Sequence, residues 1–245
     1  MDYKDRLYSA YVSTGQGGVT VLKQLQQGQQ LFAGNAPYIT QLIKRFIPTD
    51  RSIRIVDLGC GHGIYLYFLK QEGYQNLVGI DTSEEQVALA HRLGIHEVQR
   101  GDIGDFLSGD DKLADVVLLI DILEHLPLTV AFDLLDRIYV KLNKGGRLII
   151  HVPNAEGLFG MRMRYGDLTH EHSFTPTSMR QMLKAIGFSI ITYSEDKPVV
   201  HGMTSLVRRL LWSVLTVPHR LLLMAETGEK NFVLSQNMLV VAQKD

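Results

Sequence analysis

The sequence predicts an α/β fold in which a mainly parallel sheet is covered by helices on both faces. Short apolar segments alternate with segments whose apolar residues recur at helical spacing, and this strand–helix–strand pattern repeats between residues 36 and 155. The 245 residues are 45% apolar and 21% charged, as in an ordinary globular domain. Connections of this kind are right-handed crossovers, so consecutive strands are expected to run parallel.

The first strand is expected at Ile53–Asp57 and the helix after it at Ile64–Lys70. An earlier helix between Pro37 and Pro48 should cover this strand, because its apolar residues recur at helical spacing. These residues are Ile39, Leu42, Ile43 and Phe46.

Three glycines, Gly59, Gly61 and Gly63, occupy the turn between the first strand and its helix. Glycine allows positive φ and brings the backbone close to a ligand, while the N–H groups at the start of the helix point outward. The turn therefore predicts a site for a nucleotide-like ligand.

Acidic residues follow or close four expected strands. The strands are Ile53–Asp57, Asn76–Asp81, His96–Arg100 and Ala114–Ile120, and the acids are Asp57, Asp81, Asp102 and Asp121. The Asp57 carboxylate would repel the pyrophosphate of a nicotinamide cofactor, whereas a ligand with an ammonium group can use it. Asp81 is placed to accept hydrogen bonds from both hydroxyls of a ribose.

Helix signals continue along the chain. Ser83 with Gln86 begins a helix that Gly94 ends, and Pro127 begins a longer helix that runs through Leu142. A fifth strand is expected at Arg147–Val152.

Beyond Asn154 the regular alternation stops. Residues 155–174 are expected to be a long functional loop, since they are polar and show little apolar periodicity. The elements expected after this loop are a helix from Thr175-Pro176 to Gly187, a strand near Phe188–Ser194, an insertion at 197–233 with helices on either side of Pro218, and a terminal strand at Gln236–Gln243.

Five motifs resemble the class I S-adenosylmethionine-dependent methyltransferases in order and spacing. They are VDLGCGHG (56–63), GIDTSEEQVALA (79–90), RGDI (100–103), LIDILEHL (119–126) and GGRLIIHVPN (145–154). More loosely, YVSTG (11–15), RYGDLTHEHSFTP (164–176) and LSQNMLVVA (234–242) resemble bacterial members found with polysaccharide biosynthesis. The resemblance implies a Rossmann-like seven-stranded mixed sheet whose last strand is antiparallel.

The resemblance also implies S-adenosyl-L-methionine as the cofactor. The residues expected to bind it are Asp57, Gly59, Cys60, Gly61, Gly63, Asp81, Thr82, Asp102, Ile103, Asp121 and Ile122. Cys60 is expected to serve by being small, and His62 through its backbone. Residues 1–35 are expected to form an N-terminal arm or lid, and residues 36–245 the methyltransferase domain.

Methyl transfer to a hydroxyl requires a group that accepts its proton, and histidine suits that role near neutral pH. His125 and His170 are the candidate catalytic residues, whereas His151 is expected to be structural. The candidate substrate residues are Arg164, Glu171 and His172. No metal is expected, because His170 and His172 are only two positions apart and no third ligand is evident.

The acceptor expected from the resemblance is a sugar hydroxyl of a nucleotide-sugar, glycolipid or polysaccharide precursor. One alternative is a quinone-type or other small-molecule O-methyltransferase, and another is a module that binds the cofactor without catalysis. A nicotinamide-dependent sugar oxidoreductase or epimerase is disfavoured by Asp57, by the glycine spacing and by the lack of a Tyr-x-x-x-Lys segment.

The formal net charge of −1 disfavours nucleic acid as a partner. A single cysteine and the lack of a long apolar run predict a cytoplasmic protein. Residues 204–224 carry an apolar stripe flanked by Arg208, Arg209 and Arg220. This stripe is expected to pack as a lid, to form a homodimer contact, or to lie in the membrane interface so that a lipid-linked saccharide can reach the cofactor.

Overall fold

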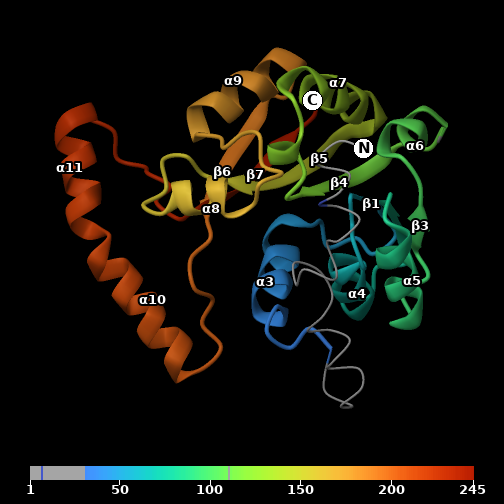
Figure 1. Ribbon diagram of the computed structural model, residues 1–245, viewed down its shortest axis with the longest axis horizontal. Helices are drawn as coiled ribbons and strands as arrows, with labels where there is room; N and C mark the ends of the chain where they lie inside the picture. The colour runs from blue at the N-terminus through green and yellow to red at the C-terminus, as the bar shows by residue number, and fades with distance from the viewer. Residues whose placement is uncertain (1–6, 8–30, 110) are drawn as a thin grey trace.

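The computed structural model describes residue 7, residues 31–109 and residues 111–245. The N-terminal arm or lid expected over residues 1–35 lies outside these described residues, apart from residue 7 and residues 31–35. One twisted sheet runs through the centre, with helices on both faces (Figure 1).

The sheet contains seven strands in the order β3-β2-β1-β4-β5-β7-β6. They are β1 (Arg54–Leu58), β2 (Asn76–Asp81), β3 (Val98–Arg100), β4 (Ala114–Ile120), β5 (Leu142–Pro153), β6 (Ile190–Glu195) and β7 (Asn237–Gln243). The first five pair in parallel, while β7 is antiparallel to both β5 and β6. This confirms the expected seven-stranded mixed sheet with an antiparallel last strand.

Helices α3 (Ala36–Phe46), α4 (Ile64–Gln71) and α5 (Glu84–Arg92) cover one face of the sheet. Helices α6 (Ile103–Gly109), α7 (Leu128–Lys141) and α9 (Pro176–Ile186) cover the other (Figure 1). Each layer has its own cluster of buried apolar side chains. The strands β1 and β4 contribute to both clusters, since alternate residues of a strand point to opposite faces.

The helix ends follow the capping signals read from the sequence. The Ser83 hydroxyl accepts from the Gln86 amide at the start of α5, and Gly94 beyond the end of that helix has φ of +80°. Thr175 and Ser178 form a reciprocal capping box at the start of α9, and Gly187 caps its end.

Helix α6 was not expected from the sequence. The Asp102 side chain caps its first turn by accepting from the Asp105 amide at 3.1 Å. Leu107 of this helix is buried, and Ile103 and Phe106 pack partly buried against the same apolar cluster as α7. The sequence did contain a signal for this helix, namely the Asp cap followed by apolar residues at spacings of three and four. The helix is too short for that spacing to show a clear period.

Other expected boundaries need correction. The loop expected at 155–174 contains the helix α8 (Gly160–Gly166). β5 begins at Leu142 rather than Arg147, because Leu142 pairs with Ala114 before a register shift at the two glycines. β6 begins at Ile190 rather than Phe188, and the Phe188 side chain fills the core instead.

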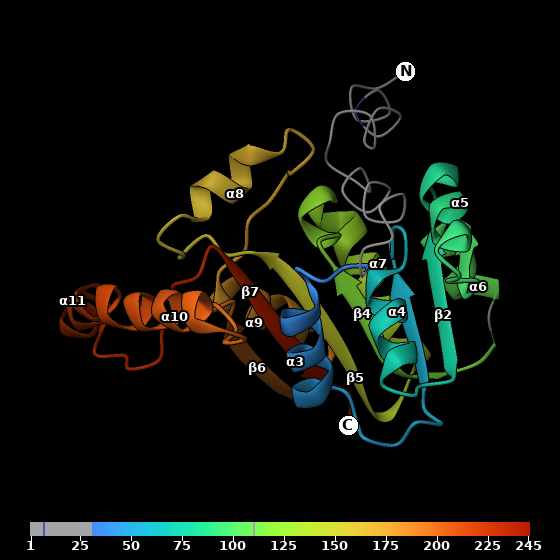
Figure 2. The same ribbon diagram turned by 90° about the horizontal axis from the view of Figure 1, so that it is seen from below.

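The insertion at 197–233 contains the expected helices, α10 (Met203–Leu215) and α11 (Val217–Thr227). They project from the β6 side of the sheet, away from the layered body (Figure 2). Among the described residues, no helix has the length and apolar content needed to cross a bilayer.

Candidate functional site

The glycine turn lies at the carboxyl end of β1, where a parallel sheet of this kind binds ligands. Gly59 and Gly61 have φ of +72° and +54°. A Cβ on Gly59 would lie 2.2 Å from Cδ1 of Ile122, which packs directly over the turn. Only glycine satisfies both the backbone conformation and the contact with Ile122 at this position.

The carboxylate of Asp81, at the end of β2, fixes the shape of this turn. One oxygen accepts from the Gly61 amide at 2.7 Å, and the other accepts from the Ser83 amide at 2.8 Å. A carboxylate oxygen has two acceptor sites, so each oxygen keeps capacity for one further donor. Asp81 can therefore hold the turn and bind a pair of ligand hydroxyls at once.

Asp57 is the buried acid behind the glycine turn, with 1% of its surface exposed. Its Oδ2 atom has no hydrogen-bond partner among the described residues. Burial, with a further contribution from the Asp81 charge, raises the pKa of Asp57 to about 7. An unpaired buried carboxylate is costly, so this atom points to a ligand or water that supplies a donor or a positive charge.

The remaining residues expected around the cofactor take three different places. Cys60 is buried against Gly79, in agreement with a small structural side chain. Thr82 and Asp102 are exposed at the ends of β2 and β3. Ile103 and Ile122 pack partly buried on the core, and Ile122 also faces the glycine turn.

A second polar cluster follows β4. Glu124 and His125 lie on a single 3₁₀ turn, Leu123–His125, and His170 comes from the loop before α9. A ligand atom from each of the three side chains lies within 4.8 Å of the others. The two imidazole centroids are 4.6 Å apart with an interplanar angle of 67°. The structure thus brings together both histidines that the sequence proposed as catalytic.

Hydrogen bonds indicate which nitrogen of each histidine carries the proton. His170 Nδ1 lies 2.9 Å from the Met163 carbonyl, which can only accept. His125 Nδ1 lies 2.8 Å from the Thr169 hydroxyl, which itself donates to Asp167 at 2.6 Å. Both Nδ1 atoms are therefore donors, so in the neutral form of either ring the lone pair is on Nε2.

Two pKa shifts characterise the cluster. Burial and the neighbouring His170 lower the pKa of His125 to about 4, so this imidazole is neutral at neutral pH. Burial and the Asp121 charge raise the pKa of Glu124 to about 8. Glu124 is 1% exposed, and its Oε2 atom has no hydrogen-bond partner within the described part of the chain.

The same three side chains offer the donor set of a divalent-cation site, with two imidazoles and one carboxylate. The expectation of no metal rested on the lack of a third ligand beside His170 and His172. The structure provides Glu124 and His125 as partners of His170. His172 instead places its ring 6.3 Å from that of Phe174.

The loop residues expected to bind substrate make backbone contacts in the structure. The Arg164 guanidinium donates to the carbonyls of His170 at 2.5 Å and Glu171 at 2.8 Å. The amides of Glu171 and His172 donate to the Glu124 carbonyl at 2.7 and 3.1 Å. These contacts fix His170 against the 3₁₀ turn, and a direct contact of these residues with an acceptor stays a prediction.

Sequence reasoning missed an ionic network centred on the buried His151. His151 of β5 lies between two carboxylates, with Nδ1 2.5 Å from Asp121 and Nε2 2.6 Å from Asp196. The Tyr38 hydroxyl donates to the other oxygen of Asp196 at 2.8 Å. Burial alone would lower the pKa of His151, but the two carboxylates outweigh it and hold that pKa well above its usual value.

This network fixes Asp121, the residue at the end of β4, which has an unusual φ of +54°. Positive φ at a residue other than glycine is uncommon and costs free energy, so surrounding contacts must hold it. The His151 imidazolium supplies such a contact. The four residues come from distant parts of the chain, and no spacing in the sequence signals their meeting.

Comparisons with known proteins agree with this geometry. A family model described as a methyltransferase domain matches residues 31–193, well over half of the chain. A small RNA 2′-O-methyltransferase of Caenorhabditis elegans is 26% identical over 179 residues. That match covers 62% of this chain, which spans only 40% of the relative's length.

Two solved structures share the fold. A SAM-dependent methyltransferase from Archaeoglobus fulgidus superposes with a TM-score of 0.65 at 21% identity, covering 93% of this chain and all of that one. The magnesium protoporphyrin IX methyltransferase of Synechocystis PCC 6803, solved with bound SAM, gives a TM-score of 0.57 at 17% identity, covering 100% and 98% of the two chains. With the family match and the glycine turn at the end of β1, these findings show that the chain belongs to the class I S-adenosylmethionine-dependent methyltransferases.

Proposed function

We propose that this methyltransferase acts on a hydroxyl of a small polar acceptor, namely a sugar hydroxyl of a nucleotide-sugar, glycolipid or polysaccharide precursor. The observation that carries the proposal is the cluster of Glu124, His125 and His170 at the carboxyl end of β4. The cofactor's methyl group is already activated by its sulfonium, so the chain's own residues must orient the acceptor and remove its proton. An amine attacks in its neutral form and would need no such cluster.

We assign the cofactor to the carboxyl edge of β1 and β2. The residues present fit S-adenosylmethionine, because Asp57 offers an unpaired buried oxygen to its ammonium group, directly or through water, and Asp81 offers acceptor capacity to its ribose. The Gly59–Gly63 turn leaves room for the backbone to approach the ligand.

The pKa of Asp57 gives this assignment a pH test. In the free protein that pKa is about 7, and a bound ammonium group would lower it, so binding favours the deprotonated form. Binding of S-adenosylhomocysteine at about pH 7 is therefore expected to release protons, and its affinity should rise as pH rises through this value. Titration calorimetry in two buffers with different ionisation enthalpies measures the proton release.

Asp57→Asn is the matched control for this test, since it keeps the side-chain shape and removes the titrating group. The variant should bind more weakly and release no proton in the same pH range. Equal proton release by both proteins would assign the effect to another group and remove Asp57 from the cofactor site.

Two other acceptor classes, quinone-type phenols and ribose hydroxyls, are the alternatives to a saccharide. A quinone-type phenol would use the same proton acceptor. A ribose hydroxyl is favoured by the similarity to the small RNA 2′-O-methyltransferase, while the net charge of −1 provides little attraction for a long polyanion. All three acceptors present a hydroxyl, so the chemistry required of the cluster is the same.

Turnover of methyl-labelled S-adenosylmethionine against a panel decides among these acceptors. The panel contains nucleotide-sugars, lipid-linked saccharides, catechol-type quinone precursors and short RNA oligonucleotides. Each reaction is run after chelation by EDTA and again with added Mg²⁺, Mn²⁺ or Zn²⁺. Methylated saccharide is the expected product, whereas methylation of amines alone would overturn the proposal.

The metal arm of that experiment separates two uses of the same cluster. If the histidines act as proton acceptors only, activity survives chelation. Loss of activity with EDTA and its return with one added cation would assign Glu124, His125 and His170 to a metal that binds the acceptor oxygen.

We further propose that the protein works in the cytoplasm, which fits its single cysteine, Cys60, buried and unpaired. For the insertion at 197–233, a homodimer contact is the alternative to a membrane contact.

A further inference from the structure

Helices α10 and α11 form one arm beside the layered body (Figure 1). Thr216, between the two helices, has right-handed helical dihedral angles, and Pro218 lies in the first turn of α11, where proline is tolerated. At 1.5 Å per residue, residues 203–227 form a rod about 37 Å long. We define these residues as the arm.

The arm turns its less apolar side toward the protein. The residues with the least exposure recur at spacings of three and four, so they share one side of the rod. They are Ser205, Arg209, Trp212, Thr216, Arg220 and Leu223. Two arginines of this stripe, Arg209 and Arg220, were expected from the sequence to flank the apolar face.

The large apolar side chains point away from the body and are exposed. They cover about half of the helix circumference, opposite the stripe that faces the protein. They are Met203, Leu206, Val207, Leu210, Leu211, Val214, Leu215, Val217, Leu221, Leu222 and Met224, with exposures from 37% to 75%. A soluble domain rarely leaves so continuous an apolar surface uncovered, so this face indicates a binding surface.

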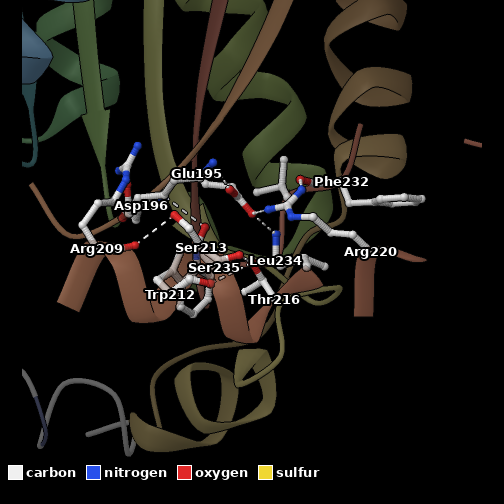
Figure 3. Close-up of polar contacts among 12 residues, drawn as sticks. Glu195, Asp196, Arg209, Trp212, Ser213, Thr216, Arg220, Phe232, Leu234 and Ser235 are labelled. Atoms are coloured by element: carbon white, nitrogen blue, oxygen red, sulfur yellow. Dashed lines mark hydrogen bonds and ion pairs between the residues drawn. The ribbon is translucent and has the colours of Figure 1, made fainter. Parts of the chain in front are cut away.

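Polar anchors fix this orientation (Figure 3). The Arg220 guanidinium pairs with Glu195 Oε1 at 2.5 Å and donates to the Phe232 carbonyl at 3.0 Å. The same Glu195 oxygen accepts from the Leu234 amide at 2.7 Å. Because Glu195 is nearly buried and ends β6, these bonds tie the arm to the sheet and keep its apolar face outward.

The charge on the arm distinguishes between possible occupants. The arm contains Arg208, Arg209 and Arg220, and its one acidic residue, Glu226, lies at its end. Arg208 is exposed and lies outside the stripe that faces the protein. At the root of the arm, His201 shares the wall of a groove of about 680 Å³ with Lys44 and Arg45 of α3. The outward apolar face carries no carboxylate that could pair with Arg208 of a second copy, whereas an anionic lipid surface supplies negative charge to Arg208, Lys44 and Arg45.

We propose that the arm docks on an anionic membrane surface, with its apolar face in the headgroup and acyl boundary and Arg208 among the headgroups. An amphipathic rod that lies flat in the interface binds through buried apolar area and attraction to anionic lipid. Glu195, which anchors the arm, is next to Asp196 of the His151 network, so docking would hold the acceptor side of the active site near the membrane.

Vesicle co-sedimentation tests the proposal with the full chain. The vesicles are phosphatidylcholine alone, or phosphatidylcholine with about one third phosphatidylglycerol, at low and high salt. Binding is expected to the anionic vesicles and to weaken with salt. Leu210→Glu with Val214→Glu, on the outward face, should lower the partition coefficient at least about tenfold, and Arg208→Glu about tenfold.

Val140→Glu is the matched control, because Val140 is an equally exposed apolar residue of α7, outside the arm. It should leave vesicle binding unchanged. The replaced arm residues are exposed, so the melting temperature should not change, and the milder pair Leu210→Ser with Val214→Ser repeats the test if the charged pair does not fold.

Light scattering on the same proteins completes the experiment. A wild-type dimer that the Leu210 and Val214 substitutions convert to a monomer, without vesicle binding, would show that a second copy covers the face and overturn the proposal. Equal binding to neutral and anionic vesicles, or equal binding by wild type and the double variant, would also overturn it.

Discussion

Replacing His170 by alanine is expected to lower kcat by about 10²–10⁴-fold, while the affinity for S-adenosylmethionine stays nearly unchanged. His170 Nδ1 is held by the Met163 carbonyl, and Nε2 carries the lone pair needed to accept a proton or bind a cation. His170 comes from the loop before α9 and is not part of the glycine turn that we assign to the cofactor. Steady-state turnover and calorimetric titration measure the two quantities.

His96→Ala is the control, since this histidine is exposed, lies outside the three-residue cluster and is not among the expected site residues. It should retain most of the activity. His125→Ala should lower kcat as well, and comparison of the two losses separates their roles. Full activity in both the His125 and His170 variants would show that the acceptor needs no proton acceptor from this cluster.

Added metal distinguishes the two uses of the cluster in these variants. A residue that binds a cation weakens metal affinity when it is removed, so excess cation restores part of the activity. A residue that only accepts a proton gives a loss that excess cation does not restore.

Asp81→Ala is expected to weaken S-adenosylmethionine binding by about 1.5–3 kcal/mol for each charge-assisted hydrogen bond that the substitution removes. Removing two hydrogen bonds to the ribose would lower the affinity by roughly two orders of magnitude or more, since about 1.4 kcal/mol is a tenfold change. The same substitution removes the acceptors of the Gly61 and Ser83 amides, so the glycine turn should also loosen. Calorimetric titration measures the affinity, and thermal unfolding measures the effect on the turn.

Asp81→Asn separates the two effects of that substitution, because an amide oxygen can still accept from one backbone amide while the charge is removed. Asp136→Ala is the surface control, since Asp136 is an exposed residue of α7 and is not among the residues expected to bind the cofactor. Unchanged affinity in Asp81→Ala would remove this residue from the cofactor site. Tighter binding of NADH than of S-adenosylhomocysteine would contradict the assignment of this edge to the methyl donor.

Local patterns predicted most of the fold. The strands β2 and β4 have the expected bounds, and α5 and α9 begin and end at their capping residues, because these features depend on neighbours three or four positions away. The helices α6 and α8 were missed, since each has only seven residues and shows too little periodicity to identify. The antiparallel last strand came from the family resemblance rather than from the pattern.

The sequence by itself determined the sheet edge that we assign to the cofactor. The glycine turn and the acids at the ends of β1 and β2 are short-range features, and parallel strands necessarily bring their carboxyl ends to one edge. The ligand-binding chemistry of these residues is therefore predictable from the sequence alone.

Only the tertiary structure decided which side chains meet beside the cofactor edge and which way the arm faces. Glu124 and His125 meet His170, and His151 meets Asp121 and Asp196, through crossovers that join segments far apart in the sequence. The arm shows the same limit, because periodicity revealed an apolar face on α10 and α11 but not the direction in which it points. The bond between Arg220 and Glu195 fixes that direction, since the free energy of a long-range ion pair depends on where folding places its two partners.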